Sequence, residues 1–262
     1  MAFDAREYWE KRLGERWSLG GVGWLGLGDG FNGWAYRVRR RVFLNNVRPL
    51  LPTGPITVAD IGSGTGFYIE CWHQLKATRI LGFDLTRVAV ENLRDKFPDV
   101  PFSQLDVSAA QHDLPCDRFS AISIMDVLFH LTDDASYERA FENLSSLLEP
   151  RGLLIMSEFY VSIDTLPRAH IVYRPRGVID KAAKKAGLEL MQCRPFLVLM
   201  NDPVDTKNRL HFALWRLLVS LARRRRLFGS IIGAALFPIE TVLVRFAHYA
   251  PSTKFLIYRK VA

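Results

Sequence analysis

The stretch that decides the fold runs from residue 58 to residue 68 and reads Val58-Ala59-Asp60-Ile61-Gly62-Ser63-Gly64-Thr65-Gly66-Phe67-Tyr68. An apolar run ends at an acidic residue, and three glycines on alternate positions then lead into a helical pattern. Glycine permits backbone dihedrals that are closed to other residues, and a helix start offers unpaired N–H groups to a ligand. The stretch therefore predicts a strand, a tight loop and a helix N-terminus that hold a small, nucleotide-like molecule.

Composition and charge limit the class of protein. The 262 residues are 49% hydrophobic and 24% charged, which is typical of one soluble globular domain. The first residues show no basic region followed by an apolar one, so we expect no signal peptide and a cytoplasmic location, which includes attachment to the periphery of a membrane. The net charge of +8 favours an acidic partner: a phosphate-bearing substrate, a nucleic acid or an anionic membrane surface.

The cysteines predict no disulfide and no metal site. Cys71, Cys116 and Cys193 are odd in number and far apart, without a Cys-x-x-Cys pair. We interpret them as reduced thiols.

Strands and helices alternate from residue 51 onward, which favours a parallel sheet covered by helices on both faces. We expect an α/β fold of three layers, doubly wound, with seven strands in one main domain over residues 51–262. The expected strands cover residues 56–61, 79–85, 102–107, 119–126, 153–159, 188–200 and 254–261. The expected helices cover residues 67–75, 87–97, the region from 133 to a stop at Pro150-Arg151-Gly152, and the region from 175 to 187.

Residues 1–50 do not resemble part of the sheet. Tyr8, Trp9, Leu13 and Trp17 recur at near-helical spacing, and a second helix is expected from about residue 34 to residue 47. Between them, seven glycines alternate with large apolar residues over Leu19–Gly33, a pattern that predicts a mobile loop. We interpret residues 1–50 as a helical lid that contributes to substrate binding.

A second addition, residues 205–251, interrupts the pattern before the last strand. Two apolar stretches flank Arg223–Arg226 there. A transmembrane span is one reading, but Gly229, Gly233, Pro238 and Glu240 break the run, and a single crossing would separate the last strand from its sheet. The sequence favours a helical hairpin packed on the domain, with peripheral membrane contact through residues 210–245 or a substrate-binding cap as open alternatives.

Aspartates stand at the expected ends of four successive strands: Asp60, Asp84, Asp106 and Asp126. A single strand-end aspartate is commonly a turn former, but ligands of such folds bind at this edge of the sheet. Asp84 has the spacing of a carboxylate that accepts ribose hydroxyls, and Asp106 is placed to accept from an adenine amino group. Phe67 stands where a dinucleotide-binding fingerprint requires its third glycine, which disfavours a nicotinamide cofactor.

At these residues the chain resembles the class I S-adenosylmethionine-dependent methyltransferases. The resemblance covers about residues 54–200 and the final strand. It rests on Asp60-Ile61-Gly62-Ser63-Gly64-Thr65-Gly66, Asp84, Asp106-Val107, Asp126-Val127-Leu128-Phe129-His130 and Leu147-Leu148-Glu149-Pro150-Arg151-Gly152-Leu153-Leu154. It implies that the last strand is antiparallel and inserted beside the fifth.

The resemblance also implies a cofactor, S-adenosyl-L-methionine, which leaves as S-adenosyl-L-homocysteine. It places the methionine part at Asp60 and the glycine loop, the ribose at Asp84, and the adenine at Asp106 and Val107. The full set of cofactor-binding residues that we expect is Asp60, Gly62, Ser63, Gly64, Gly66, Asp84, Leu85, Asp106, Val107 and Asp126.

His130 is the candidate catalytic base, because an imidazole can take a hydroxyl proton at neutral pH. A purely structural role, in which His130 packs against or caps the next helix, is the alternative. The candidate acceptor-binding residues are Tyr8, Trp9, Trp24, His170, Tyr173 and Arg174, and Arg168 and Arg174 suit an acidic substrate group.

The first hypothesis for function is methyl transfer to a small molecule, with O-methylation of a natural-product, sugar or lipid-linked acceptor preferred. The second is a nucleic-acid methyltransferase acting on RNA, suggested by the basic clusters but disfavoured because Asp126-Val127-Leu128-Phe129 lacks the Pro-Pro pattern of enzymes that methylate base amino groups. The third is a cofactor-binding, membrane-associated protein without catalysis. The sequence leaves the oligomeric state open, with a homodimer as one option.

Overall fold

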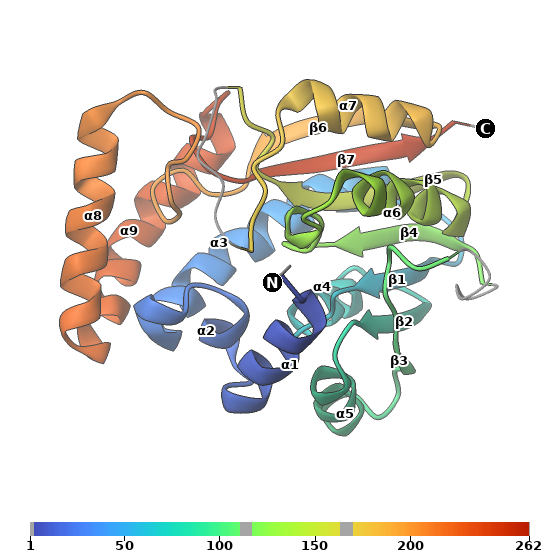
Figure 1. Cartoon of the computed structure of the whole chain (residues 1–262), viewed down its shortest axis with the longest axis horizontal. Helices are drawn as coiled ribbons and strands as arrows, with labels where there is room; N and C mark the ends of the chain where they lie inside the picture. The colour runs from blue at the N-terminus through green and yellow to red at the C-terminus, as the bar shows by residue number, and fades with distance from the viewer. Residues whose placement is uncertain (1–2, 111–116, 163–169, 262) are drawn as a thin grey trace.

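The computed structural model describes residues 3–110, 117–162 and 170–261, so Cys116 and Arg168 lie outside the described residues. Its centre is a seven-stranded sheet in the order β3-β2-β1-β4-β5-β7-β6 (Figure 1). The first five strands run parallel, and β7 is antiparallel to both β5 and β6. This confirms the predicted α/β class and the inserted antiparallel last strand. The strands are β1 (Thr57–Ile61), β2 (Arg79–Asp84), β3 (Phe102–Gln104), β4 (Phe119–Ile124), β5 (Leu148–Glu158), β6 (Leu188–Pro195) and β7 (Lys254–Lys260).

Helices cover both faces of this sheet because alternate strand residues point to opposite sides. In β7, Phe255 and Ile257 join the apolar cluster under one helical layer, whereas Leu256 and Tyr258 join the cluster under the other. The first layer holds α3 (Gly28–Val47), α4 (Phe67–Gln74) and α5 (Arg87–Lys96), and the second holds α6 (Asp134–Leu147) and α7 (Arg176–Lys185). The carboxyl ends of the parallel strands therefore form one edge between two helical layers.

The N-terminal segment is helical, but its glycine-rich part is not the loop that the composition predicts. Residues 19–33 form α2 (Leu19–Val22), the 3-10 helix η1 (Leu25–Leu27) and the first turns of α3, which begins at Gly28 and not near residue 34. Polar side chains from elsewhere satisfy this backbone. The Arg12 guanidinium of α1 (Ala5–Glu15) donates to the carbonyls of Gly21 and Gly23, at 2.7 and 2.6 Å, and Asn32 both accepts from Trp24 N–H and donates to its carbonyl. The composition of a segment does not indicate which side chains from neighbouring turns of the chain will bond to its backbone.

Several further boundaries differ from expectation. β4 ends at Ile124, so Asp126 lies beyond the strand, and β6 ends at Pro195 and not at residue 200. The third strand ends at Gln104, so Asp106 lies in the following turn and not at a strand end. Helix α6 ends at Leu147, and the Pro150-Arg151-Gly152 passage belongs to β5, which begins at Leu148. The pairing of β4 with β5 shifts register between Phe119 and Ala121, which accommodates these residues inside a strand.

Residues 205–251 carry two long helices between β6 and β7: α8 (Arg209–Arg224) and α9 (Arg226–Phe246). Figure 1 shows them side by side at one end of the molecule, with α9 next to α3. Glu240 of α9 is fully buried and accepts hydrogen bonds from the backbone N–H groups of Val198 and Leu199, after β6. Residues 227–246 of α9 are long and apolar enough to cross a membrane, yet Glu240 anchors this helix to the domain.

The glycines of α9 allow its close approach to the N-terminal segment, and this predicts opposite effects for one substitution at two helical sites. A Cβ atom on Gly229 would lie 2.6 Å from the Leu27 carbonyl oxygen, whereas a Cβ atom on Gly14 in α1 meets nothing within 4 Å. We expect Gly229→Ala to lower the free energy of unfolding by about 1–3 kcal/mol and Gly14→Ala to raise it by about 0.5–1 kcal/mol. Urea denaturation of both variants checks this, and equal effects in the two would contradict the described packing.

Candidate functional site

The glycine loop lies at the carboxyl edge of the sheet and is tied to β2. Gly62, Gly64 and Gly66 all have positive φ angles of 73°, 54° and 78°, a region that side chains rarely adopt. The N–H groups of Gly62 and Ser63 donate to the Phe83 carbonyl, at 2.8 and 2.9 Å. The alternating glycines are thus required by backbone conformation, and the loop leads directly into α4.

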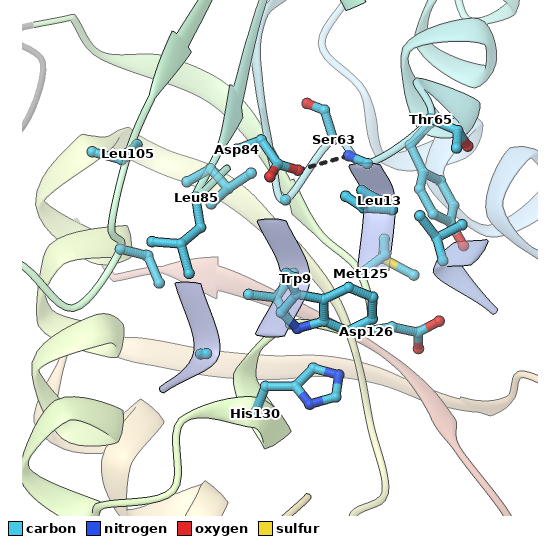
Figure 2. A pocket seen from close by; sticks show the side chains of 18 of the residues that line it. Trp9, Leu13, Ser63, Thr65, Asp84, Leu85, Leu105, Met125, Asp126 and His130 are labelled. Atoms are coloured by element: carbon cyan, nitrogen blue, oxygen red, sulfur yellow. Dashed lines mark hydrogen bonds between the residues drawn. The ribbon is translucent and has the colours of Figure 1, made fainter. Parts of the chain in front are cut away.

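Asp84, the last residue of β2, fastens the loop from the other side. Its Oδ2 accepts from the Gly64 N–H at 2.9 Å (Figure 2). Its Oδ1 accepts from the N–H and the hydroxyl of Thr86. Burial raises the pKa of this carboxyl, although these hydrogen bonds oppose the rise. A carboxylate offers about four lone-pair positions, so three protein donors leave about one for a ligand. Accepting both hydroxyls of a ribose requires one protein donor to turn away.

Asp60 lies beneath the loop and does not line the pocket that the other predicted residues share. Its Oδ1 accepts from the Ser123 hydroxyl at 2.5 Å, and its side chain is almost fully buried. Burial raises the pKa of Asp60 to about 6. Its Oδ2 is buried and has no hydrogen-bond partner among the described atoms, so this carboxylate retains capacity for a donor from the ligand side of the loop.

One pocket brings together most of the predicted cofactor residues. It is bounded by the glycine loop, by the ends of β2 and β4 and by α1 (Figure 2). Of the predicted cofactor residues, those that line it are Gly62, Ser63, Gly64, Asp84, Leu85, Asp106, Val107 and Asp126. Gly66 lies outside the lining, where a Cβ atom would come within 2.2 Å of the Phe97 ring.

Asp126 is held by a buried ion pair that the sequence did not reveal. The Arg39 guanidinium of α3 donates to Asp126 Oδ2, and the Ser157 hydroxyl donates to Asp126 Oδ1 at 2.7 Å. Asp126 adopts a positive φ of 59°, which turns its carboxylate from the end of β4 toward α3. Burial alone would lower the pKa of Arg39, but the Asp126 carboxylate raises it above its usual value. The charge of Asp126 is therefore already balanced within the protein.

His130 stands at the end of the 3-10 helix η4 (Leu128–His130) and lines the same pocket. Its Nδ1 lies 2.7 Å from the His170 carbonyl oxygen. A carbonyl oxygen can only accept, so Nδ1 carries the proton and Nε2 carries the lone pair. Burial lowers the pKa of His130 to about 4, so the imidazole is neutral at physiological pH.

Of the six predicted acceptor residues, Trp9 alone lines the pocket, with its ring 5.1 Å from that of His130. Tyr8 and His170 stack on each other, with ring centroids 5.2 Å apart, outside the pocket lining. The other three also lie outside the lining: Trp24, Tyr173 and Arg174.

These three have contacts elsewhere in the fold. Trp24 donates to Asn201, and Tyr173 packs on Phe159. The buried Arg174 guanidinium donates to Asp134 and to the Leu131 carbonyl. Arg174, which the sequence analysis proposes as a ligand for an acidic substrate group, is therefore already paired with groups at the start of α6.

Several pocket residues escaped the sequence analysis. Tyr36 of α3 and Tyr68 of α4 line the pocket, and the buried Tyr68 hydroxyl has no hydrogen-bond partner among the described atoms. Trp17 donates from Nε1 to the Gly64 carbonyl at 2.9 Å, and Val22 packs against Gly64. Tyr68 could have been predicted as a pocket residue, because it follows the glycine loop directly. Tyr36 and Trp17 could not, because the local sequence does not indicate which face of a helix packs against the edge of the sheet.

The described site fits a nucleoside-bearing cofactor with a charged amino acid tail. Bare glycine backbone, one remaining acceptor position on Asp84 and the second carboxylate of Asp106 are donor and acceptor groups that such a ligand needs. Among the described residues, no group of three or more His, Cys, Asp or Glu side chains is arranged to hold a metal ion.

The comparison with protein families agrees with this geometry. Residues 58–152 match the family described as "Methyltransferase domain". The matched residues contain the glycine loop, Asp84, Asp106, Asp126 and His130. The match agrees with the resemblance to the class I S-adenosylmethionine-dependent methyltransferases and with S-adenosylmethionine as the cofactor that this resemblance implies.

A curated relative matches part of the chain. The ubiquinone/menaquinone biosynthesis C-methyltransferase UbiE of Campylobacter jejuni subsp. jejuni serotype O:6 is 27% identical over 128 residues, which are 47% of this chain and 52% of that protein. The chain therefore spans about half the length of the curated relative that it matches. The similarity supports the match to a methyltransferase domain. It does not identify the methyl acceptor of this chain.

Solved structures share the fold over most of the chain. Magnesium protoporphyrin IX methyltransferase (ChlM) from Synechocystis PCC 6803, with bound S-adenosylhomocysteine, has a TM-score of 0.57 at 15% identity and covers 97% of each chain. The [4+2]-cyclase SpnF has a TM-score of 0.53 at 19% identity, covering 85% of this chain and 81% of its own. At such identities the likeness shows the fold alone, because one fold hosts unrelated reactions.

The Asp84 geometry makes a binding prediction for this methyltransferase domain. Asp84→Asn keeps the shape of the side chain but removes its charge and turns one acceptor into a donor facing Gly64 or Thr86. We expect its affinity for S-adenosylhomocysteine to fall about tenfold or more by isothermal titration calorimetry. Asp117→Asn, at an ion pair with Arg79 on the surface, is the matched control and should bind as the wild type does. Equal affinities in all three proteins would contradict the role of Asp84.

Proposed function

We propose that this chain is an S-adenosylmethionine-dependent methyltransferase whose acceptor is a small, largely apolar molecule with an acidic hydroxyl, such as a phenol or an enol. The observation that carries the proposal is the continuity of one pocket from the cofactor residues to His130. Asp84 and Asp106 lie at one side of the pocket, and Trp9, Tyr36, Tyr68 and His130 complete it. An apolar, aromatic wall with a few convergent polar atoms suits an organic ring.

In this proposal His130 takes the proton of the acceptor, and its place in the pocket lining supports that role. A sulfonium-bound methyl group is already activated, so the protein mainly has to hold the attacking atom close and in line. The hydroxyl proton of the acceptor moves to Nε2 of His130, because Nδ1 already donates to the His170 carbonyl. A base whose pKa is about 4 accepts only a partly acidic proton efficiently, which favours phenols and enols over sugar hydroxyls.

Loss of that proton leaves the acceptor nucleophilic at oxygen and at the adjacent carbon. The bond from sulfur to the methyl carbon breaks as a bond from that carbon to oxygen or carbon forms, and the sulfonium charge disappears with it. His130 thus serves O-methylation, which the sequence analysis prefers, and C-methylation, which the printed name of the curated relative describes for that protein. In both cases the protein supplies the same positioned lone pair.

An RNA acceptor has less support. The pocket wall opposite the cofactor residues is aromatic and apolar, and the arginine cluster of residues 223–226 lies on the α8–α9 hairpin, outside the pocket lining. We also propose a cytoplasmic location, in keeping with the odd number of cysteines and with the free thiols of Cys71 and Cys193 among the described residues.

Methyl transfer itself tests the proposed function. Purified protein, S-adenosylmethionine and a panel of hydroxylated aromatic and enolic compounds should release S-adenosylhomocysteine, and mass spectrometry should find a methylated product. Amines and sugars serve as comparison acceptors. Binding of S-adenosylhomocysteine without transfer to any hydroxylated compound would favour the non-catalytic alternative.

Two His130 variants separate its Nε2 from its Nδ1. The amide nitrogen of His130→Asn can still donate to the His170 carbonyl but leaves no acceptor at the position of Nε2, so we expect kcat to fall about a hundredfold. Affinity for S-adenosylhomocysteine should stay unchanged. In the wild type the low pKa keeps the base form present above about pH 4, so His130 should cause no inflection in kcat/KM between pH 6 and pH 8.

His130→Gln is the complementary variant, because its amide lies nearer the position of Nε2. We therefore expect it to retain more activity than His130→Asn. Full activity of His130→Asn would show that His130 only packs against its neighbours.

A further inference from the structure

The outer surface of the α8–α9 hairpin exposes an unusual amount of apolar side chain. On α8, Leu210, Leu214 and Leu217 follow one another at helical spacing and are 76%, 41% and 56% exposed. On α9, exposed apolar residues continue from one end of the helix to the other: Leu227, Phe228, Ile231, Ile239, Val242 and Phe246. Monomeric soluble proteins rarely expose apolar stripes of this length without a partner.

Each helix contacts the domain through its opposite face at a few buried residues: Trp215 and Ala222 on α8, and Gly229, Gly233 and Glu240 on α9. Trp215 of α8 is buried against Trp24, with ring centroids 5.6 Å apart. On α9, a Cβ atom on Gly233 would lie 2.8 Å from the Trp34 ring, and the buried Glu240 is hydrogen-bonded to the backbone after β6. Only 17% of the most apolar window of α9 is buried. One face of each helix belongs to the fold and the other lacks a partner.

Positive charge accompanies the apolar stripes. Arg209, Arg216 and Arg223 recur every seven residues, so they follow one side of α8 beside the leucine stripe. Arg224 and Arg225 are exposed at the turn of the hairpin, and Arg245 is exposed near the end of α9. None of these six arginines forms an ion pair with a side chain that the structure describes.

Acidic residues are almost absent from the same region. Between residues 209 and 246 the sequence contains seven arginines and a single acidic residue, Glu240, whose side chain is buried. The outer face of the hairpin is therefore apolar and cationic at once. Helices of this kind lie in the interface of a bilayer, with apolar side chains among the acyl chains and arginines at the phosphates.

We propose that the α8–α9 hairpin docks the chain on the surface of an anionic lipid bilayer, without crossing it. The charge pattern argues against a second copy of the chain as the occupant. A symmetric dimer would place the same arginine-bearing face against itself with no exposed acid to balance it. A crossing is disfavoured because Glu240 and the close-packed glycines hold α9 against the domain.

The docked orientation bears on the proposed function and rests on it. The hairpin contacts the N-terminal segment at Leu27, where Gly229 approaches the carbonyl, and at Gly30, beside Ser230. The same segment lines the pocket through Val22 and Trp9. The hairpin would therefore connect the bilayer to the segment that lines the pocket, and the acceptor would be an apolar molecule carried by the lipid phase.

Vesicle flotation of the full chain tests the docking. With zwitterionic vesicles we expect little binding, and with vesicles containing anionic phospholipid we expect the protein to float, less so as salt rises. The triple variant Arg209→Gln/Arg216→Gln/Arg224→Gln should bind anionic vesicles at least about tenfold more weakly than the wild type. The matched control, Lys181→Gln/Lys184→Gln/Arg194→Gln, removes the same charge from exposed sites on α7 and β6 and should float as the wild type does.

A second variant isolates the apolar contribution. Leu210→Asn/Ile231→Asn changes two exposed side chains and should fold normally but detach from anionic vesicles at moderate salt. Absence of flotation in the wild type, equal loss in the control triple, or lipid-free dimerisation through the hairpin would overturn the proposal. Calorimetry with S-adenosylhomocysteine, done without lipid, keeps these outcomes separate from a failure of the proposed methyl transfer.

Discussion

The ion pair between Arg39 and Asp126 ties the N-terminal segment to the sheet. Arg39 comes from α3 and Asp126 follows β4, and their side chains are 9% and 22% exposed, so the Arg39 charge is buried and the Asp126 charge is only partly solvated. The Arg39 guanidinium also lies 4.8 Å from the Phe196 ring, just after β6. Removing one partner from such a pair leaves a buried charge without compensation, at a cost of about 3–5 kcal/mol.

This pair explains why the N-terminal segment forms a wall of the pocket. Once Arg39 is fixed, α3 places Tyr36 one turn earlier on the same side of the helix, facing the glycine loop. Trp17 then reaches the Gly64 carbonyl from the preceding segment. A segment that the family domain of residues 58–152 does not include is thus bonded directly to its cofactor loop.

The sequence was informative where structure follows from local pattern. Strand β1, the positive-φ glycines and the aspartates near strand ends were predictable, because each depends on residues within a few positions. The N-terminal loop was predicted wrongly, because Arg12 and Asn32 satisfy its backbone from other turns of the chain. The ion pairs of Arg39 with Asp126 and of Arg174 with Asp134 join residues that are 87 and 40 positions apart in the sequence, and no local pattern predicts such pairs.

The cofactor side and the acceptor side of the pocket therefore differ in how well sequence defines them. The cofactor side uses main chain and strand ends, which every sheet of this order places at the same edge. The acceptor side is built from α1, α3 and η4, and the structural likeness to the cyclase SpnF shows that this edge also occurs in a protein with a different reaction. The wall of the pocket that the proposed acceptor would contact thus combines the added helices α1 and α3 with η4 of the matched domain.

Helix α1 also acts on the first turn of α5, through the carboxylate of Glu10. Its two oxygens accept the N–H groups of Arg87 and Val88, at 2.8 and 3.0 Å, and Thr86 accepts that of Ala89. Lifting α1 from the pocket exposes those two amide groups and removes a helix cap, which costs on the order of 1 kcal/mol. Trp9 and Leu13 of the same helix line the pocket, whereas Glu10 does not. The position of this pocket wall is thereby tied to the first turn of α5 by a side chain that lies outside the pocket lining.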